Sequence, residues 1–118
     1  MNDTNGVKPQ IKYEDFAKID VRIGTVLAAE KVEKSEKLIK LEVNFGDLGL
    51  RTILTGLAMW YKPEDFTGKQ LAFVVNLESK KMMGMESQGM IMGVGLTDDK
   101  KAVFLLPENA VENGEGVR

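Results

Sequence analysis

Short stretches in which apolar and polar residues alternate run through this chain, and they restrict its fold more than any other feature. The first stretch sets Ile19, Val21 and Ile23 between polar residues, and its phase slips after Gly24. A glycine at such a slip is typical of a bulge or bend in a long strand, which can then serve both halves of a barrel. The same alternation predicts a strand at 39–45, and further strands are predicted at 51–55, 70–76, 89–95 and 102–106. The run at 70–76 is almost continuously apolar, which is typical of a strand that is buried on both sides or closes a barrel.

Only two short helical turns fit between these strands. One is predicted over residues 13–17, and the other begins at Pro63, before two acidic residues, and ends at Gly68. About five or six strands joined by short turns suit a small closed barrel better than a two-sheet sandwich. The pattern therefore predicts an all-β fold, an OB-type five-stranded barrel with short helical turns.

The length of 118 residues suits one domain with one core. Residues 1–10 lack a periodic apolar pattern, so we expect a flexible lead-in, either a cloning remnant or the end of a linker from a larger protein. Residues 11–118 form the single predicted domain. No apolar run is long enough to span a bilayer, so we expect no membrane association and a cytoplasmic location.

Cysteine and histidine are both absent. Their absence excludes disulfides, thiolate metal ligands, cysteine nucleophiles and the usual triads and zinc sites. We therefore expect no catalytic residues, no metal and no cofactor, and a binding module is favoured over an enzyme. Three acidic pairs offer the weakest alternative, a small hydrolase, but each lies at a helix start or turn where capping or solvation explains it: Glu14-Asp15, Glu64-Asp65 and Asp98-Asp99.

The formal net charge of −2 and pI near 5.2 argue mildly against a nucleic-acid partner. The charge pattern is more informative than the sum, because lysine and glutamate alternate over residues 30–42. Lys31, Lys34 and Lys37 could form a basic ridge that follows phosphates, or the hairpin could be solvated and neutralise itself.

Methionine is concentrated in and just after the segment NLESKKMMGMESQGM, residues 76–90. Five of the seven methionines lie here beside Lys80 and Lys81: Met82, Met83, Met85, Met90 and Met92. Flexible methionines next to lysines suit a single-stranded or splayed nucleic acid, since bases pack on the thioethers and ammonium groups neutralise phosphates. The alternative is that Met90 and Met92 lie in the barrel interior.

Three segments together resemble a known family: DFAKIDVRIGTV, NLESKKMMGMESQGM and the ending ENGEGVR. They are similar to the tRNA-binding domain at the C-terminus of many methionyl-tRNA synthetases, which also occurs as a β-subunit, as a stand-alone structure-specific tRNA-binding protein and as a chaperone-like relative. The resemblance covers residues 11–118. It implies an OB fold with short N- and C-terminal additions that build a homodimer, and a surface that holds tRNA by its shape.

The resemblance also implies which residues bind tRNA and which proteins are partners. The family's binding signature falls on seven positions: Asn76, Lys81, Met82, Gly84, Ser87, Gly89 and Met90. Lys80 stands where a basic residue is common in the family, so we expect eight binding residues in all. The expected function is a non-catalytic tRNA-binding module that works with, or derives from, methionyl-tRNA synthetase, whose catalytic part would be a partner besides tRNA. The alternative is a chaperone-like dimer of the same fold that binds extended polypeptides.

Overall fold

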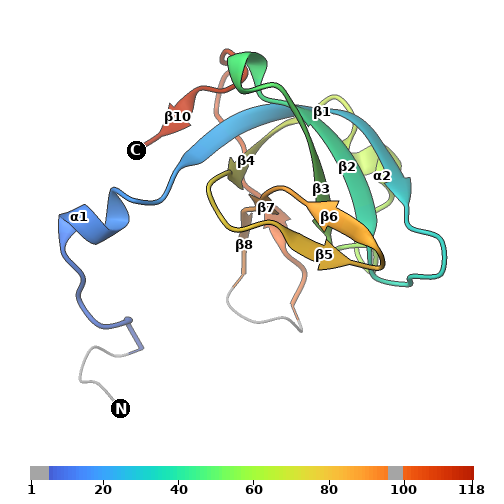
Figure 1. The fold of residues 1–118 in the computed structure, drawn as a ribbon, viewed down its shortest axis with the longest axis horizontal. Coiled ribbons are helices and arrows are strands. Elements are labelled where there is room, and N and C mark those ends of the chain that lie inside the picture. Colours follow the sequence, from blue (N-terminus) through green and yellow to red (C-terminus); the bar gives the residue numbers. More distant parts are fainter. Residues whose placement is uncertain (1–5, 96–99) are drawn as a thin grey trace.

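The computed structural model describes residues 6–95 and 100–118. Its main sheet has the strand order β3-β2-β1-β4-β7, all antiparallel, and β10 pairs with β1 beside it (Figure 1). Two small ladders, β5 with β6 and β8 with β9, lie off this sheet. The elements in chain order are α1 (Tyr13–Phe16), β1 (Val21–Lys31), β2 (Ile39–Asn44), the 3₁₀ turn η1 (Gly46–Leu48), β3 (Leu50–Thr55), α2 (Pro63–Phe66), β4 (Gln70–Val74), β5 (Lys80–Met82), β6 (Met85–Ser87), β7 (Met90–Ile91), β8 (Gly93–Val94), β9 (Val103–Phe104) and β10 (Gly116–Val117).

The long strand β1 joins the two halves of the curled sheet, as predicted. Its first part, 21–25, pairs with β4, and its second part, 25–31, pairs with β2. The irregularity lies between Val26 and Ala28 rather than at Gly24. Gly24 is required for another reason: a Cβ there would lie 2.6 Å from Val43 Cγ1 and 2.8 Å from the Phe45 ring.

The core lies on the concave side of this sheet and is closed by α2. Its fully buried side chains come from β1, β2, β3, β4 and α2, and the rings of Phe45 and Phe73 meet edge to face at 5.4 Å. Phe104 of β9 stacks on Tyr61 with ring centroids 4.2 Å apart, and its ring lies 5.1 Å from that of Phe66, so β9 packs against α2 and the turn before it. The alternating pattern of β2 thus buries one face of that strand, whereas the continuous apolar run of β4 is buried on both faces, with Ala72 and Val74 in a second, smaller cluster.

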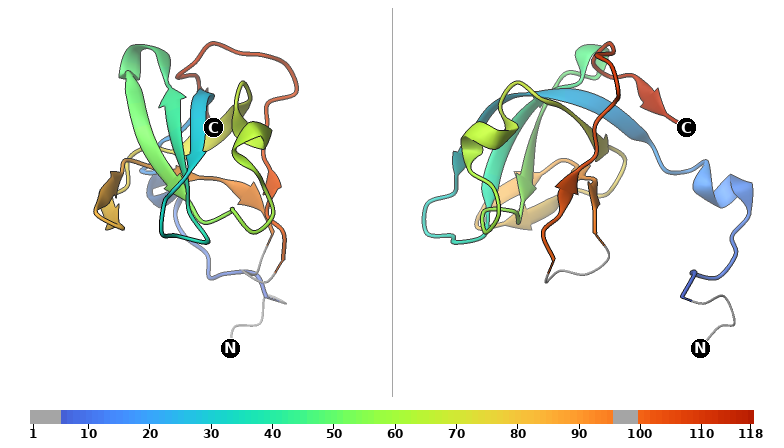
Figure 2. Two further views of the ribbon diagram at one scale, coloured as in Figure 1. Left: turned by 90° about the vertical axis from the view of Figure 1, so that its right-hand side faces the viewer. Right: turned by 180° about the vertical axis from the view of Figure 1, so that it is seen from behind.

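The two ends of the chain behave differently. The C-terminal segment folds back on β1, with Gly114 N donating to Ile23 O at 2.7 Å and Ile23 N donating to Glu115 O at 3.0 Å. The N-terminal segment and α1 extend away from the sheet (Figures 1 and 2), and no residue of α1 is buried. Tyr13 is 79% exposed and Phe16 50%, so the helix presents unpartnered aromatic surface.

The predicted fold class is confirmed, with corrections at several elements. Mostly β structure, a curled antiparallel sheet and two short helices are present. The strand expected at 89–95 is divided, because β7 pairs with β4 whereas β8 turns away to pair with β9. The strand expected at 102–106 is reduced to β9, and residues 80–87, for which no strand is predicted, form the hairpin β5–β6.

Two of the three acidic pairs cap helices, as expected. Asp15 Oδ2 accepts from Lys12 N at 3.2 Å, and Asp65 Oδ2 accepts from Lys62 N at 2.8 Å. The pair Asp98-Asp99 lies outside the described residues. Within residues 6–95 and 100–118, no helix has the length and apolar character needed to cross a membrane, and no cluster of acidic side chains is placed to hold a metal ion.

Candidate nucleic-acid interface

The methionine-rich segment forms a tight hairpin, β5–β6, with Lys80 opposite Ser87, Lys81 opposite Glu86 and Met82 opposite Met85. Its two turn residues have positive φ, 52° at Met83 and 78° at Gly84. A two-residue turn with both φ values positive matches the twist of a hairpin and favours glycine. Gly84 therefore shapes the hairpin, and Met83 is held in a conformation that its side chain disfavours.

The hairpin is fixed to the edge strand β3 by a set of short hydrogen bonds. Ser87 Oγ accepts from Leu54 N at 3.0 Å and donates to Gly89 O at 3.1 Å. Gln88 binds Thr52 twice, through its backbone N–H to Thr52 O at 2.8 Å and through its Oε1, which accepts from Thr52 N at 3.0 Å. In the described part of the chain no strand ladder joins β3 to β7, so these bonds close the open side of the half-barrel.

Alternation along the hairpin separates its two faces. Met82, Met85 and Ser87 share one face, and the methionines are half-buried there while Ser87 is buried. Lys81 and Glu86 share the other face and are exposed. Lys80 is also exposed, and among the ion pairs of the described residues none involves either lysine. The two ammonium groups are therefore available to a phosphate, although Glu86 offsets part of the charge of Lys81.

Asn76 follows β4 and ties the N-terminal segment to the sheet. Its Oδ1 accepts from Asp20 N at 2.9 Å, and its Nδ2 donates to Lys18 O at 2.6 Å. Both polar atoms of the amide are thus engaged within the protein. The adjacent N–H of Val75 donates to Asp20 O at 2.9 Å, so the start of β1 is held firmly at this point.

Gly89 and Met90 differ in their surroundings. A Cβ on Gly89 would lie 3.0 Å from both Ile53 Cδ1 and Val74 O, so the site requires close backbone approach. Met90 is 49% exposed and borders a large pocket, whereas Met92 packs against the smaller cluster of Val21, Ile23, Ala72 and Val74. Because Ala72 and Val74 alternate along β4 with Leu71 and Phe73 of the main core, this smaller cluster lies on the opposite face of the sheet, so neither methionine lies in the barrel interior.

The basic ridge predicted on the β1–β2 hairpin is divided by the fold. Lys31 faces a depression of about 310 Å³ that Met83 and Met85 also line, whereas Lys37 borders the pocket beside Met90. Lys40, in the same depression, lies 3.8 Å from Glu30 in a partly exposed ion pair. The tip of the methionine-rich hairpin and the β1–β2 hairpin thus flank one groove.

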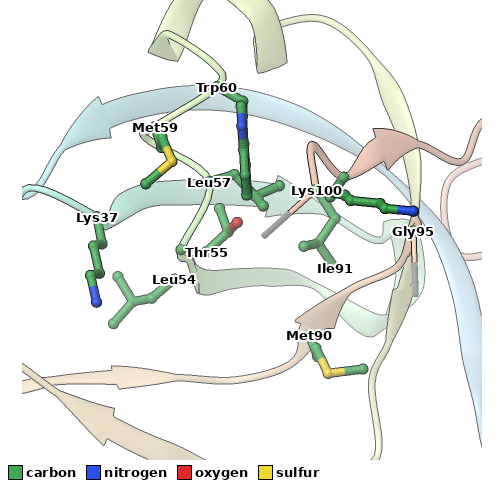
Figure 3. A pocket seen from close by; sticks show the side chains of 12 residues that line it. Lys37, Leu54, Thr55, Leu57, Met59, Trp60, Met90, Ile91, Gly95 and Lys100 are labelled. Atoms are coloured by element: carbon green, nitrogen blue, oxygen red, sulfur yellow. The ribbon is translucent and has the colours of Figure 1, made fainter. Parts of the chain in front are cut away.

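Sequence reasoning missed the residues that build the pocket beside Met90. Trp60, Thr55 and Lys100 line it together with Lys37 and Met90 (Figure 3). Trp60 lies in a turn after β3 and belongs to no alternating or helical pattern of apolar residues in the sequence. Its status as the sole tryptophan was the one available signal.

Comparison with known proteins identifies the family of this chain. A family model described as "Putative tRNA binding domain" matches residues 21–116. The chain belongs to this family of tRNA-binding domains.

Curated relatives that the chain resembles include two methionine–tRNA ligases. The Archaeoglobus fulgidus ligase is 50% identical over 110 residues and the Flavobacterium psychrophilum ligase is 47% identical over 111 residues; each alignment covers 93% of this chain and 16% of the ligase. The chain thus spans about one sixth of the length of these relatives. It is related to one domain of theirs.

Solved structures of similar fold include both synthetase-related and chaperone proteins. A methionyl-tRNA synthetase related protein from Pyrococcus horikoshii superimposes with a TM-score of 0.87 at 40% identity, covering 94% of this chain and all of that one. The chaperone CsaA from Bacillus anthracis gives a TM-score of 0.83 at 34% identity, covering 93% of this chain and all of that one.

Proposed function

We propose that this domain is a non-catalytic module that binds tRNA by its shape, through the side of the OB-type half-barrel that bears the methionine-rich hairpin. The observation that supports this most directly is the fixing of that hairpin to β3 by Ser87 and Gln88. A hairpin held by several hydrogen bonds presents Lys80 and Lys81 at fixed positions, and fixed cations can match a particular spacing of phosphates.

The eight predicted binding residues divide into contact and positioning groups in this proposal. Lys80 and Lys81 contact phosphates, and Met82 and Met90 offer apolar surface to the RNA. The other four act by shaping the interface: Asn76, Gly84, Ser87 and Gly89. The division follows from the polar atoms of Asn76 and Ser87, which are already bonded inside the protein, and from the backbone constraints at the two glycines.

We also propose that the domain works as a homodimer through its terminal additions. The exposed rings of Tyr13 and Phe16 lie 6.5 Å apart on α1, and Ile11, Ile19 and Val117 add exposed apolar side chains. Aromatic surface on a short helix with no buried residue is unfavourable in water unless a partner covers it.

The relationship to methionine–tRNA ligases supports a role beside such an enzyme. In this role the domain raises the affinity of a ligase for tRNA, either in trans or as part of a longer chain, and itself performs no aminoacylation. Its place of work would be the cytoplasm, where the ligase and tRNA meet.

A gel-shift titration over several salt concentrations tests the function. Total tRNA should bind more tightly than single-stranded DNA of equal length, and an unfolded polypeptide should not compete. The lack of any shift with tRNA at low salt would contradict the proposal.

The likeness to the chaperone CsaA supports one second candidate, a dimer that binds extended polypeptides. It would use the same methionine-rich side, because methionine adapts to irregular apolar partners. Competition by the unfolded polypeptide, with little response to salt, would favour this alternative.

A further inference from the structure

A pocket lies beside Met90, and Lys81 does not line it. We call it the Trp60 pocket; its volume of about 520 Å³ falls within the range of about 300–1,000 Å³ that is typical of sites for small organic groups. Its wall combines the half-buried indole of Trp60 with the exposed thioethers of Met59 and Met90. Flat aromatic surface with adaptable thioethers suits a planar ring.

Two lysines give this apolar pocket a positive border. Lys37 comes from the loop between β1 and β2, and Lys100 precedes β9; Figure 3 shows them on opposite sides of the group formed by Trp60, Thr55 and Met90. Both are exposed, and no ion pair of the described residues involves them. An occupant with a flat apolar body and negative charge at both ends matches this arrangement.

The pocket also contains a buried hydroxyl without a partner. Thr55 is 4% exposed, and its Oγ1 makes no hydrogen bond to any of the residues that the structure describes. Its oxygen lies among the lining side chains in Figure 3. A buried hydroxyl with no partner destabilises the fold, and an occupant whose polar edge reaches it would remove that penalty. Less than 1 Å² of this oxygen is exposed, so a lining side chain such as Leu57 must change rotamer on binding, a common event at interfaces.

We propose that the Trp60 pocket receives one unstacked nucleobase of the bound RNA. The base stacks on Trp60 and packs against Met90, its polar edge bonds the Thr55 hydroxyl, and the flanking phosphates lie against Lys37 and Lys100. The proposal rests on the RNA-binding function and adds a second element to it. The hairpin holds paired RNA by its backbone, whereas this pocket requires a base that is free of pairing.

Trp60 is the only tryptophan, so its fluorescence reports on the pocket alone. The full chain is titrated with total tRNA, a single-stranded oligoadenylate and a blunt RNA duplex of the same length, with affinity followed separately by gel shift. The tRNA and the oligoadenylate should quench Trp60 at saturation, and the duplex should bind without quenching. A tRNA that binds but leaves the Trp60 spectrum unchanged overturns the pocket while leaving the function intact; no tRNA binding at low salt overturns both.

Thr55→Val separates a binding role from a structural one. Loss of an unpartnered hydroxyl should leave the melting temperature unchanged or raise it, while the affinity for oligoadenylate falls by about three- to tenfold. Trp60→Leu, which keeps apolar bulk, should lower that affinity by about ten- to a hundredfold. The matched control is Thr67→Val at the exposed position that follows α2, and this variant should bind oligoadenylate as tightly as the parent protein.

The lysines give an independent measurement. Lys37→Ala and Lys100→Ala should each weaken oligoadenylate and reduce its salt dependence, whereas Lys8→Ala in the N-terminal segment should not. Unchanged oligoadenylate affinity in both the Thr55 and Trp60 variants would refute the proposal. Quenching of Trp60 by an unfolded polypeptide but not by oligoadenylate would also refute it, in favour of a peptide site.

Discussion

The hydroxyl of Ser87 accepts a hydrogen bond from the backbone N–H of Leu54 at 3.0 Å, across the open side of the half-barrel. Both residues are buried, and the same hydroxyl donates to Gly89 O. Ser87 therefore serves as a structural link between β3 and the hairpin that bears the lysines. Its effect on RNA is expected to be indirect.

Ser87→Ala should destabilise the protein, because it leaves the buried Leu54 N–H without a partner. The expected loss in the free energy of unfolding is about 1–3 kcal/mol, measured by chemical denaturation. Ser79→Ala, at an exposed position before β5, is the control and should change it by less than about 0.5 kcal/mol. If Ser87→Ala unfolds at the denaturant concentration of the parent, the link is not structural.

Lys80→Ala and Lys81→Ala should weaken all nucleic acids to a similar degree, since ammonium groups contact phosphates without reading bases. Each change should reduce the slope of log affinity against log salt by roughly 0.7–0.9, as expected for one lost phosphate contact. Gel shifts at several salt concentrations measure the slope, with Lys8→Ala as the control. If both variants keep the salt slope of the parent protein, the phosphate contacts lie elsewhere.

Gly114→Ala should detach the C-terminal segment from the sheet. A Cβ at Gly114 would lie in severe overlap with Phe45 O, and the backbone has φ of 91°, which alanine disfavours. We expect a loss of more than about 2 kcal/mol in the free energy of unfolding. Gly116→Ala is the matched control, because nothing lies within 4 Å of a Cβ there; equal melting temperatures for the two variants would contradict the expected clash.

Phe16→Ser should convert the proposed dimer to a monomer at micromolar concentrations without lowering the melting temperature of the monomer, because no residue of α1 is buried in the described chain. Sedimentation velocity measures the association state. Leu50→Ser removes a similarly exposed apolar side chain from β3 and should leave association unchanged. A parent protein that sediments as a monomer would rule out the dimer.

Asn76→Ala should loosen the connection between α1 and β1, because it removes both hydrogen bonds from the amide to Asp20 N and Lys18 O. We expect faster amide hydrogen exchange at residues 18–20 and a salt slope for tRNA equal to that of the parent. A reduced slope with unchanged exchange would instead make Asn76 a direct RNA contact.

The sequence by itself determined the fold class and the family. Alternation with period two forces one face of a strand such as β2 into the core, and the continuous apolar run of β4 marks a strand buried on both faces. Proline and glycine at 63 and 68 limit α2 to one short turn, so all these features are visible in the local sequence. The lysines and methionines of residues 80–90 are likewise visible as an unusual composition. Nothing in their spacing distinguishes a loop from the hairpin that the structure contains.

Only the tertiary structure decided what the polar residues of the site do. Ser87 and Asn76 look like free ligands in the sequence, but their partners lie 33 and 56 residues away along the chain, and hydrogen bonds between such distant residues exist only after the sheet has curled. The Trp60 pocket arises for the same reason. Its walls come from the β1–β2 loop, the end of β3 with the turn that follows it, β7 and the segment before β9, and no local pattern in the sequence brings these four together.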